Sequence, residues 1–231
     1  NFYDGIGGEP NYKGLNGGPH KDSDIYGNTF TGCSDDGLEA EGPQVNVRIW
    51  GNTVKGCKVG IGVAPQYIGP SYIFDNVLVN SGNDALKLGE VSRGKAYIYH
   101  NTVVGGQHGA ANSGGDSSAN FYSNIVFRNN DFDANRRGLS GASGGNSYDF
   151  DNLRGDYVAS WCGSSNSPCG SRSDYSSLSS FQSATGQEKN GLSVASQFEN
   201  PGASDYRLKS TSPLIDKGVV IVGFNDQTSQ R

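Results

Sequence analysis

Short apolar segments alternate with polar turns along most of the chain, and they recur at a regular interval. Each segment has the form apolar-x-x-Asn, and a further apolar residue follows soon after the Asn. The five segments span residues 25–28, 49–52, 73–76, 98–101 and 126–129, with a weaker sixth at 148–152. Their asparagines, from Asn28 to Asn129, are spaced 24, 24, 25 and 28 residues apart.

Each repeat continues with a turn rich in Gly, Asn or Asp and then a further short apolar stretch. One repeat therefore holds three short strands, too few to bury an apolar side without neighbouring repeats. Stacking such repeats predicts an all-β, right-handed parallel β-helix of five to six coils, each of about 24 residues. The asparagines would then hydrogen-bond along a column inside one turn.

The cysteines give an independent check on this register. Cys33 and Cys57 each follow a repeat asparagine by five residues, so they occupy the same place on adjacent coils. Strands in a sheet lie about 4.8 Å apart, which is within the Cα separation of a disulfide. Cys162 and Cys169 bracket a Gly/Ser/Asn/Pro loop that a second disulfide would hold. Two disulfides predict a secreted or extracellular protein.

From about Asp24 to Gly141 the repeats resemble the right-handed parallel β-helix proteins of the pectate lyase-like superfamily. This superfamily includes polysaccharide lyases, epimerases, polygalacturonases, phage tailspikes and adhesins. The tail at 205–218 is similar to the closing segment of many secreted bacterial members. The resemblance implies a β-helix whose substrate lies along the strand that follows the longest turn.

The pattern divides the chain into three parts. Residues 1–23 are expected to be a loop against the first coil or the remainder of upstream coils. Residues 24–153 are the predicted coils, and residues 154–231 form an irregular C-terminal cap. The open ends of a β-helix expose strand edges, so self-association or contacts with a parent chain are expected there.

Polar residues recur beside the inward-facing residues Leu38, Ile61, Leu86, Ala110 and Leu139 of the third strand in each repeat. Because side chains alternate along a strand, the outward residues of successive coils form columns. One column contains Glu39, Gly62, Lys87, Ala111 and Ser140. Two columns precede it in the turn: Asp35, Lys58, Asn83, Gln107 and Arg136, and then Asp36, Val59, Asp84, His108 and Arg137.

These columns contain the groups that β-elimination or C5 epimerisation of a uronic acid needs. Asp35, Asp36, Glu39 and Glu41 crowd the first coil, and carboxylates are the ligands that Ca²⁺ prefers. Lys87 is the predicted base, on the condition that burial or a nearby Arg lowers its pKa. His108, Arg136 or Arg137 would assist or donate a proton. Asp84, Asn83 and Lys58 would contact the substrate, in a shallow trough at Gly62 and Ala64.

Each of these residues also has a structural explanation. Asp35 and Asp36 precede Gly37 in an ordinary turn sequence. Lys87, His108 and the two arginines would then be solvated side chains of strands or turns. Most of the aromatic residues Trp50, Tyr67, Tyr72, Tyr97 and Tyr99 are expected to stack on one another from coil to coil.

Composition narrows the choice of function. Glycine accounts for 35 of the 231 residues, which argues against helices, and the net charge of −5 argues against a nucleic-acid partner. No apolar run approaches the length of a membrane span. The leading hypothesis is a secreted enzyme acting on an acidic polysaccharide. The alternatives are a non-catalytic carbohydrate-binding, adhesive or filament-forming module, and a glycoside hydrolase that uses Asp36 and Asp84.

Overall fold

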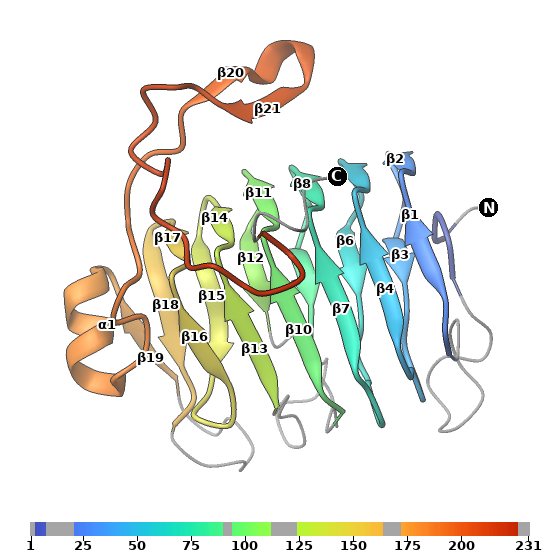
Figure 1. Cartoon of the computed structure of the whole chain (residues 1–231), viewed down its shortest axis with the longest axis horizontal. Helices are drawn as coiled ribbons and strands as arrows, with labels where there is room; N and C mark the ends of the chain where they lie inside the picture. The colour runs from blue at the N-terminus through green and yellow to red at the C-terminus, as the bar shows by residue number, and fades with distance from the viewer. Residues whose placement is uncertain (1–2, 8–20, 90–93, 112–123, 164–171, 226–231) are drawn as a thin grey trace.

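The chain winds into a parallel β-helix whose three strands per coil build three parallel sheets (Figure 1). The computed structural model describes residues 3–7, 21–89, 94–111, 124–163 and 172–225. The first sheet contains β1 (Asp24–Tyr26), β4 (Val47–Trp50), β7 (Ser71–Phe74), β10 (Ala96–Tyr99), β13 (Ile125–Arg128) and β16 (Ser147–Asp149). The second contains β2 (Thr29–Thr31), β5 (Thr53–Lys55), β8 (Val77–Val79), β11 (Thr102–Val104), β14 (Asp131–Asp133) and β17 (Asn152–Arg154).

The third sheet contains β3 (Asp36–Glu39), β6 (Val59–Gly62), β9 (Asp84–Lys87), β12 (His108–Ala111), β15 (Arg137–Ala142) and β18 (Tyr157–Trp161). The coils therefore continue past residue 153, where the repeat pattern placed their end. An antiparallel strand, β19 (Ser173–Tyr175), closes this sheet. The remaining elements are α1 (Leu178–Thr185), β20 (Phe198–Asn200), the 3₁₀-helix η1 (Pro201–Ala203) and β21 (Asp205–Leu208).

The core is a stack of apolar residues in register from coil to coil. Ile25, Ile49, Ile73 and Ile98 are paired along the first sheet, and the other two sheets contribute equivalent rows. Most of these side chains are completely buried. Burying each one stabilises the fold by about 1.5–3 kcal/mol, so the free energy of folding is distributed along the whole axis.

A buried asparagine ladder runs along the turn between the first and second sheets. The Nδ2 group of Asn52 donates to Asn76 Oδ1 at 3.0 Å, and Asn76 Nδ2 donates in turn to Asn101 Oδ1 at 2.9 Å. Each amide also donates to a backbone carbonyl of the preceding coil; for Asn76 this is the carbonyl of Ile49. The ladder thereby satisfies polar groups that would otherwise be buried without partners.

The predicted ladder is wrong by one residue in the last two coils. Asn101 bonds to Asn130 rather than to Asn129, because Ile98 pairs with Phe127 and not with Val126. In the sixth coil the ladder position is Asp151, whose Oδ1 accepts from Asn130, rather than Asn152. Adjacent asparagines at positions 129 and 130 made the two registers indistinguishable by residue type.

The predicted disulfide between adjacent coils is confirmed. Cys33 and Cys57 are joined, with their Cα atoms 4.3 Å apart. Cys162 is also disulfide-bonded, but its predicted partner, Cys169, lies outside the described residues. In the described part of the chain, no helix is long and apolar enough to cross a membrane.

The C-terminal end of the coils is capped. Phe181 of α1 is completely buried and packs edge-on against Trp161 and Tyr175. Glu188 covers the end of the asparagine ladder, where its carboxyl oxygen accepts from the backbone N–H of Asp151. Leu192 forms a parallel bridge with Asn152. Two of the three sheets therefore end against this cap, and β19 closes the third.

Aromatic side chains on the outer face of the first sheet stack as predicted. Tyr26 lies parallel to Trp50 at 4.6 Å, and Trp50 lies parallel to Phe74 at 6.0 Å. A second pair, Tyr72 and Tyr97, is stacked at 5.2 Å. Because these rings face one another, they present mainly their edges to the solvent. The distance between neighbouring coils sets the distance between the stacked rings.

The asparagine ladder gives a first testable prediction. Asn76→Ala removes two donors and an acceptor from a dry turn, and we expect it to lower the free energy of unfolding by about 2–4 kcal/mol. The matched control is Asn28→Ala in the first coil, where the side chain is partly exposed and the loss should be about 1 kcal/mol or less. Urea unfolding measures both, and equal losses would contradict a cooperative ladder.

The capped end gives a second prediction. Burial and the nearby Asp151 carboxyl raise the pKa of Glu188 well above 4.5, so the folded protein retains a proton that the unfolded chain releases. This stability is complete below the unfolded pKa and decreases as the pH rises above it. Relative to Glu188→Gln, which keeps the neutral shape, the wild type should lose stability progressively as the pH rises above 4.5. Parallel pH profiles would contradict a protonated Glu188.

Candidate functional site

The outer face of the third sheet carries the predicted polar columns in the predicted register. Val59 pairs with Asp36, and His108 pairs with both Asp84 and Arg137. Gly62 pairs with Glu39 and Lys87, and Ala111 with Lys87 and Ser140. The short strands and tight turns of each coil fix these positions, so the side chains of different coils meet on one surface.

Lys87 reaches across the coil between it and the first coil. Its Nζ lies 2.7 Å from Asp36 Oδ2 and 2.8 Å from Glu41 Oε1. The stem of Lys87 passes over Gly62, where an added Cβ would overlap Asp36 Oδ2 and lie 2.9 Å from Lys87 Cε. The predicted trough at Gly62 is therefore filled by the Lys87 side chain and its two carboxyl partners.

This cluster is buried, and its protonation differs from that of exposed groups. The side chains of Asp36 and Glu41 are only 1% and 4% exposed, and that of Lys87 is 22% exposed. Burial raises the pKa of Asp36, and burial together with Glu39 raises the pKa of Glu41 to about 8. Burial alone would lower the pKa of Lys87, but Glu41 and Asp36 together raise it above its usual value.

The condition set for Lys87 as a base is therefore not met. Two carboxyl groups keep its ammonium charged at neutral pH, whereas a base needs a free amine lone pair. In this setting Lys87 is a fixed positive charge. Removing the Lys87 side chain would also leave two buried carboxyl groups without a counterion. Lys87 therefore stabilises the fold, in addition to any role in catalysis.

Three of the four predicted calcium ligands lie together. Ligand oxygens of Asp36, Glu39 and Glu41 are within 4.8 Å of one another, and Asp36 Oδ1 has no hydrogen-bond partner among the described residues. This donor set fits Ca²⁺ in its chemistry. Lys87 already neutralises two of the three groups, so a metal ion would compete with its ammonium. The fourth residue, Asp35, instead pairs with Lys58 at 3.0 Å, where both side chains are exposed.

A second pair of ionisable groups lies one strand further along the axis. His108 Nδ1 is 2.8 Å from Asp84 Oδ1, and the Asp84 side chain is 3% exposed. A carboxylate at Nδ1 favours the neutral tautomer that donates there, which leaves the lone pair on Nε2. His108 Nε2 is itself buried, and it has no hydrogen-bond partner in the part of the chain that the structure describes. The pair thus has the arrangement of an oriented imidazole base.

The remaining candidates do not join this group. Arg137 forms two hydrogen bonds to Asp174 of β19 and lies over the Tyr157 ring at 5.1 Å, so it ties the cap to the coils. The side chains of Arg136 and Asn83 are exposed. Asp174 was missed by the sequence analysis because it lies in the cap, where no repeat places it in a column.

Comparison of the sequence with protein-family models, with curated proteins and with solved structures found no match. The parallel β-helix fold is compatible with pectate lyase-like proteins, and the geometry of the site alone carries any assignment of activity.

The Lys87 cluster gives a third prediction. Lys87→Met leaves the Asp36 and Glu41 carboxylates without a counterion, and we expect it to lower the free energy of unfolding by about 3–5 kcal/mol above pH 8, where Glu41 is ionised. The loss should shrink as the pH falls and both carboxyl groups take up protons.

Lys58→Met is the matched control for this prediction, because it removes an ammonium from an exposed pair and should cost no more than about 1 kcal/mol. Urea unfolding at several pH values compares the two variants. A loss at Lys87 no larger than that at Lys58 would show that the ammonium is not needed to neutralise the cluster.

Proposed function

We propose that this chain acts on an acidic, uronic-acid polysaccharide at the outer face of the third sheet, by β-elimination or C5 epimerisation. The observation that carries the proposal is the His108–Asp84 pair, in which a buried carboxylate orients an imidazole. The charged ammonium of Lys87 lies on the adjacent strand of the same face. Both reactions begin with removal of the C5 proton, which needs a base and a positive charge near the sugar carboxylate.

His108 is the proposed base. Asp84 accepts the Nδ1 proton, which leaves the lone pair on Nε2 to take the proton from C5. Because Nε2 is buried in the free protein, the proposed step includes a turn of the ring toward the substrate. In elimination the C4–O bond then breaks, its electron pair leaves with the oxygen, and a C4=C5 double bond forms. The imidazolium returns its proton to that oxygen. In epimerisation the C4–O bond stays intact, and C5 takes a proton from water on the opposite face. The imidazolium then releases its proton to solvent, which restores the base and neutralises the hydroxide that is left.

The proposed role of Lys87 is to hold a positive charge beside the substrate carboxylate. A fixed charge of this kind stabilises the electron pair left at C5 more than it stabilises the ground state. Asp36, Glu39 and Glu41 would hold Ca²⁺, which when bound supplies the same kind of charge. The disulfide between adjacent coils supports an extracellular location for such an enzyme, because disulfides persist in oxidising compartments.

A non-catalytic carbohydrate-binding module is the second candidate. The observation that favours it is the internal pairing of the face: Lys87, His108 and Arg137 each have an acidic partner in this chain. A surface neutralised in this way is stable without a substrate. Retained binding with no product would identify this class.

The fourth prediction tests the proposed base. In D₂O, the chain should exchange the C5 proton of at least one polymer among polygalacturonate, alginate and glucuronate-containing polysaccharides, with and without Ca²⁺. His108→Gln and Asp84→Asn should slow this exchange by about 10²–10⁴-fold, because the first removes the base and the second its orienting acceptor. Proton NMR measures exchange, and ultraviolet absorbance of the unsaturated uronate separates elimination from epimerisation.

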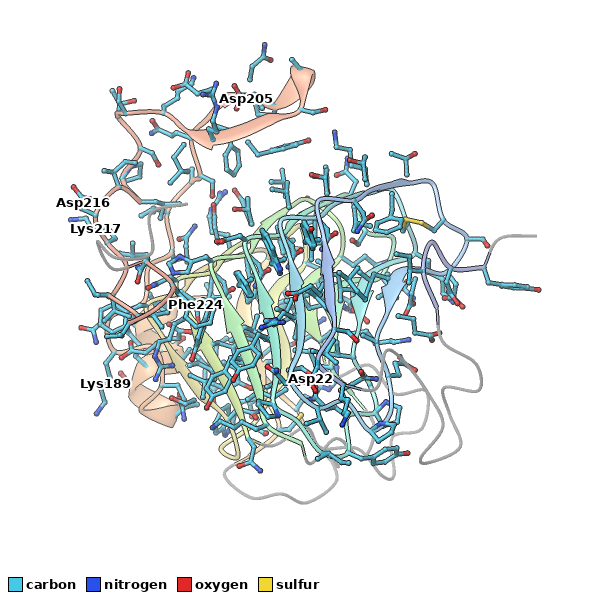
Figure 2. All side chains as sticks on the ribbon, turned by 45° about the vertical axis from the view of Figure 1, so that its right-hand side comes forward. Asp22, Lys189, Asp205, Asp216, Lys217 and Phe224 are labelled. Carbon is cyan, nitrogen blue, oxygen red and sulfur yellow. A yellow bond between two sulfur atoms is a disulfide. The ribbon has the colours of Figure 1, made fainter. Side chains whose placement is uncertain are left out.

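Lys189→Ala is the control, because this exposed side chain lies in the C-terminal cap and outside the third-sheet face (Figure 2). Undiminished exchange in His108→Gln would reject His108 as the base. Absence of exchange on every polymer, with the protein folded, would reject the enzymatic proposal.

A further inference from the structure

A cavity of about 660 Å³ lies between the coils and the last part of the chain. One wall is the turn that joins the first and second sheets, where it includes Asp75, His100 and Phe150. The other wall belongs to residues 208–225, here called the C-terminal flap, and includes Asp216 and Lys217. Its volume is within the range of small-molecule binding sites, and it is separate from the face of the third sheet.

The flap is fixed in place by specific contacts. Asn129 donates from Nδ2 to the carbonyl of Val219 at 2.8 Å, and its Oδ1 accepts from the Val219 N–H at 2.8 Å. Phe224 packs edge-on against Phe74 and Tyr99, with ring centroids 5.1 and 5.2 Å away. Figure 2 shows Phe224 against the strands, with Asp216 and Lys217 on the segment that leads to it. The cavity is therefore formed before any ligand arrives.

The turn beneath the flap has an unusual choice of residues. The position before each ladder residue has a positive φ in every coil: 66° at Gly27, 62° at Gly51, 54° at Asp75, 55° at His100, 60° at Asn129 and 63° at Phe150. Glycine, used in the first two coils, adopts this conformation without steric cost, whereas His and Phe do not. Side chains replace glycine only in the later coils, beside the flap. Neither His100 nor Phe150 is needed to form the turn, since glycine suffices in the first two coils.

One residue that lines the cavity, Asp131, has a buried polar atom without a partner in the described chain. Asp131 is 91% buried, since its exposed fraction is 9%, and its Oδ2 has no hydrogen-bond partner in the described ranges. Three residues with carboxyl groups, Asp75, Asp131 and Asp216, line the cavity together with a single lysine, Lys217. Burial lowers the pKa of His100, so its ring is neutral and adds no positive charge. The lining thus favours hydroxyl donors and disfavours anions.

We propose that the cavity beneath the C-terminal flap binds a neutral, hydroxyl-rich saccharide of one or two rings. Carboxylate acceptors suit vicinal hydroxyl groups, Lys217 supplies a donor, and Phe150 offers an apolar ring to a sugar face. His100 Nε2 lies 3.3 Å from the Asn129 Nδ2 donor, so the neutral ring offers a ligand its Nδ1–H as a donor. The excess of carboxyl groups selects against uronates. Neutral saccharides therefore differ from the acidic substrate proposed for the third sheet. Each of the two proposals can be rejected without affecting the other.

The test is calorimetric titration of the full chain with glucose, galactose, mannose, xylose and their β-linked disaccharides. At least one should bind saturably. Asp75→Gly and His100→Gly reproduce the residues of the first two coils, so they keep the turn and remove the side chain. Each should weaken binding by about tenfold or more, as loss of a hydrogen bond to such a group does. The melting temperature should stay the same or rise in Asp75→Gly, whereas His100→Gly also loses the contact with Asn129 Nδ2.

Asp22→Gly is the matched control, because Asp22 also has a positive φ, 50°, and does not line the cavity. Its affinity for the saccharide should equal that of the wild type. Three results would overturn the proposal: no saturable binding of any neutral saccharide, equal affinity in Asp75→Gly and His100→Gly, or tighter binding of galacturonate or glucuronate than of the neutral sugars.

Discussion

The fixed spacing between coils is the constraint on which the rest of the structure depends. Every coil must place its residues over the equivalent residues of its neighbour, about 4.8 Å away, so an error in one coil would displace three sheets at once. The asparagine ladder sets this register at the turn between the first and second sheets, because each amide bonds to the next amide and to a backbone carbonyl. Variation is therefore confined to residues that point outward and to longer turns, and both candidate sites are built from such residues.

Stacking also brings outward charges into columns, and the third sheet shows how the fold accommodates them. Asp36 and Glu41 lie close together in one coil, and Lys87 reaches them from two strands away because Gly62 leaves room for its stem. The ammonium of Lys87 lowers the free-energy cost of burying these carboxyl groups. The carboxyl groups in turn keep the ammonium charged. A residue that pattern analysis offers as a base thus becomes a counterion once its neighbours are known.

The sequence was enough to predict the fold class, the coil length, the Cys33–Cys57 disulfide and the register of the third sheet. All four follow from the regular interval of about 24 residues between repeats. It failed where the period is irregular. The interval from Asn101 to Asn130 is 29 residues, and that from Asn130 to Asp151 is 21, so a fixed period no longer identified the ladder position.

The contacts of the site were harder to predict than its positions. Columns specify which residues share a face, but the reach of Lys87 over Gly62 depends on a side-chain conformation that no spacing encodes. The flap and Asp174 lie in non-repeating chain, which has no register from which to infer a neighbour. The positive-φ column was nevertheless visible in the sequence, since Gly27 and Gly51 give way to Asp75 and His100. A position where glycine is the least strained choice, and where the chain uses other residues only beside a cavity, points to selection for something other than stability.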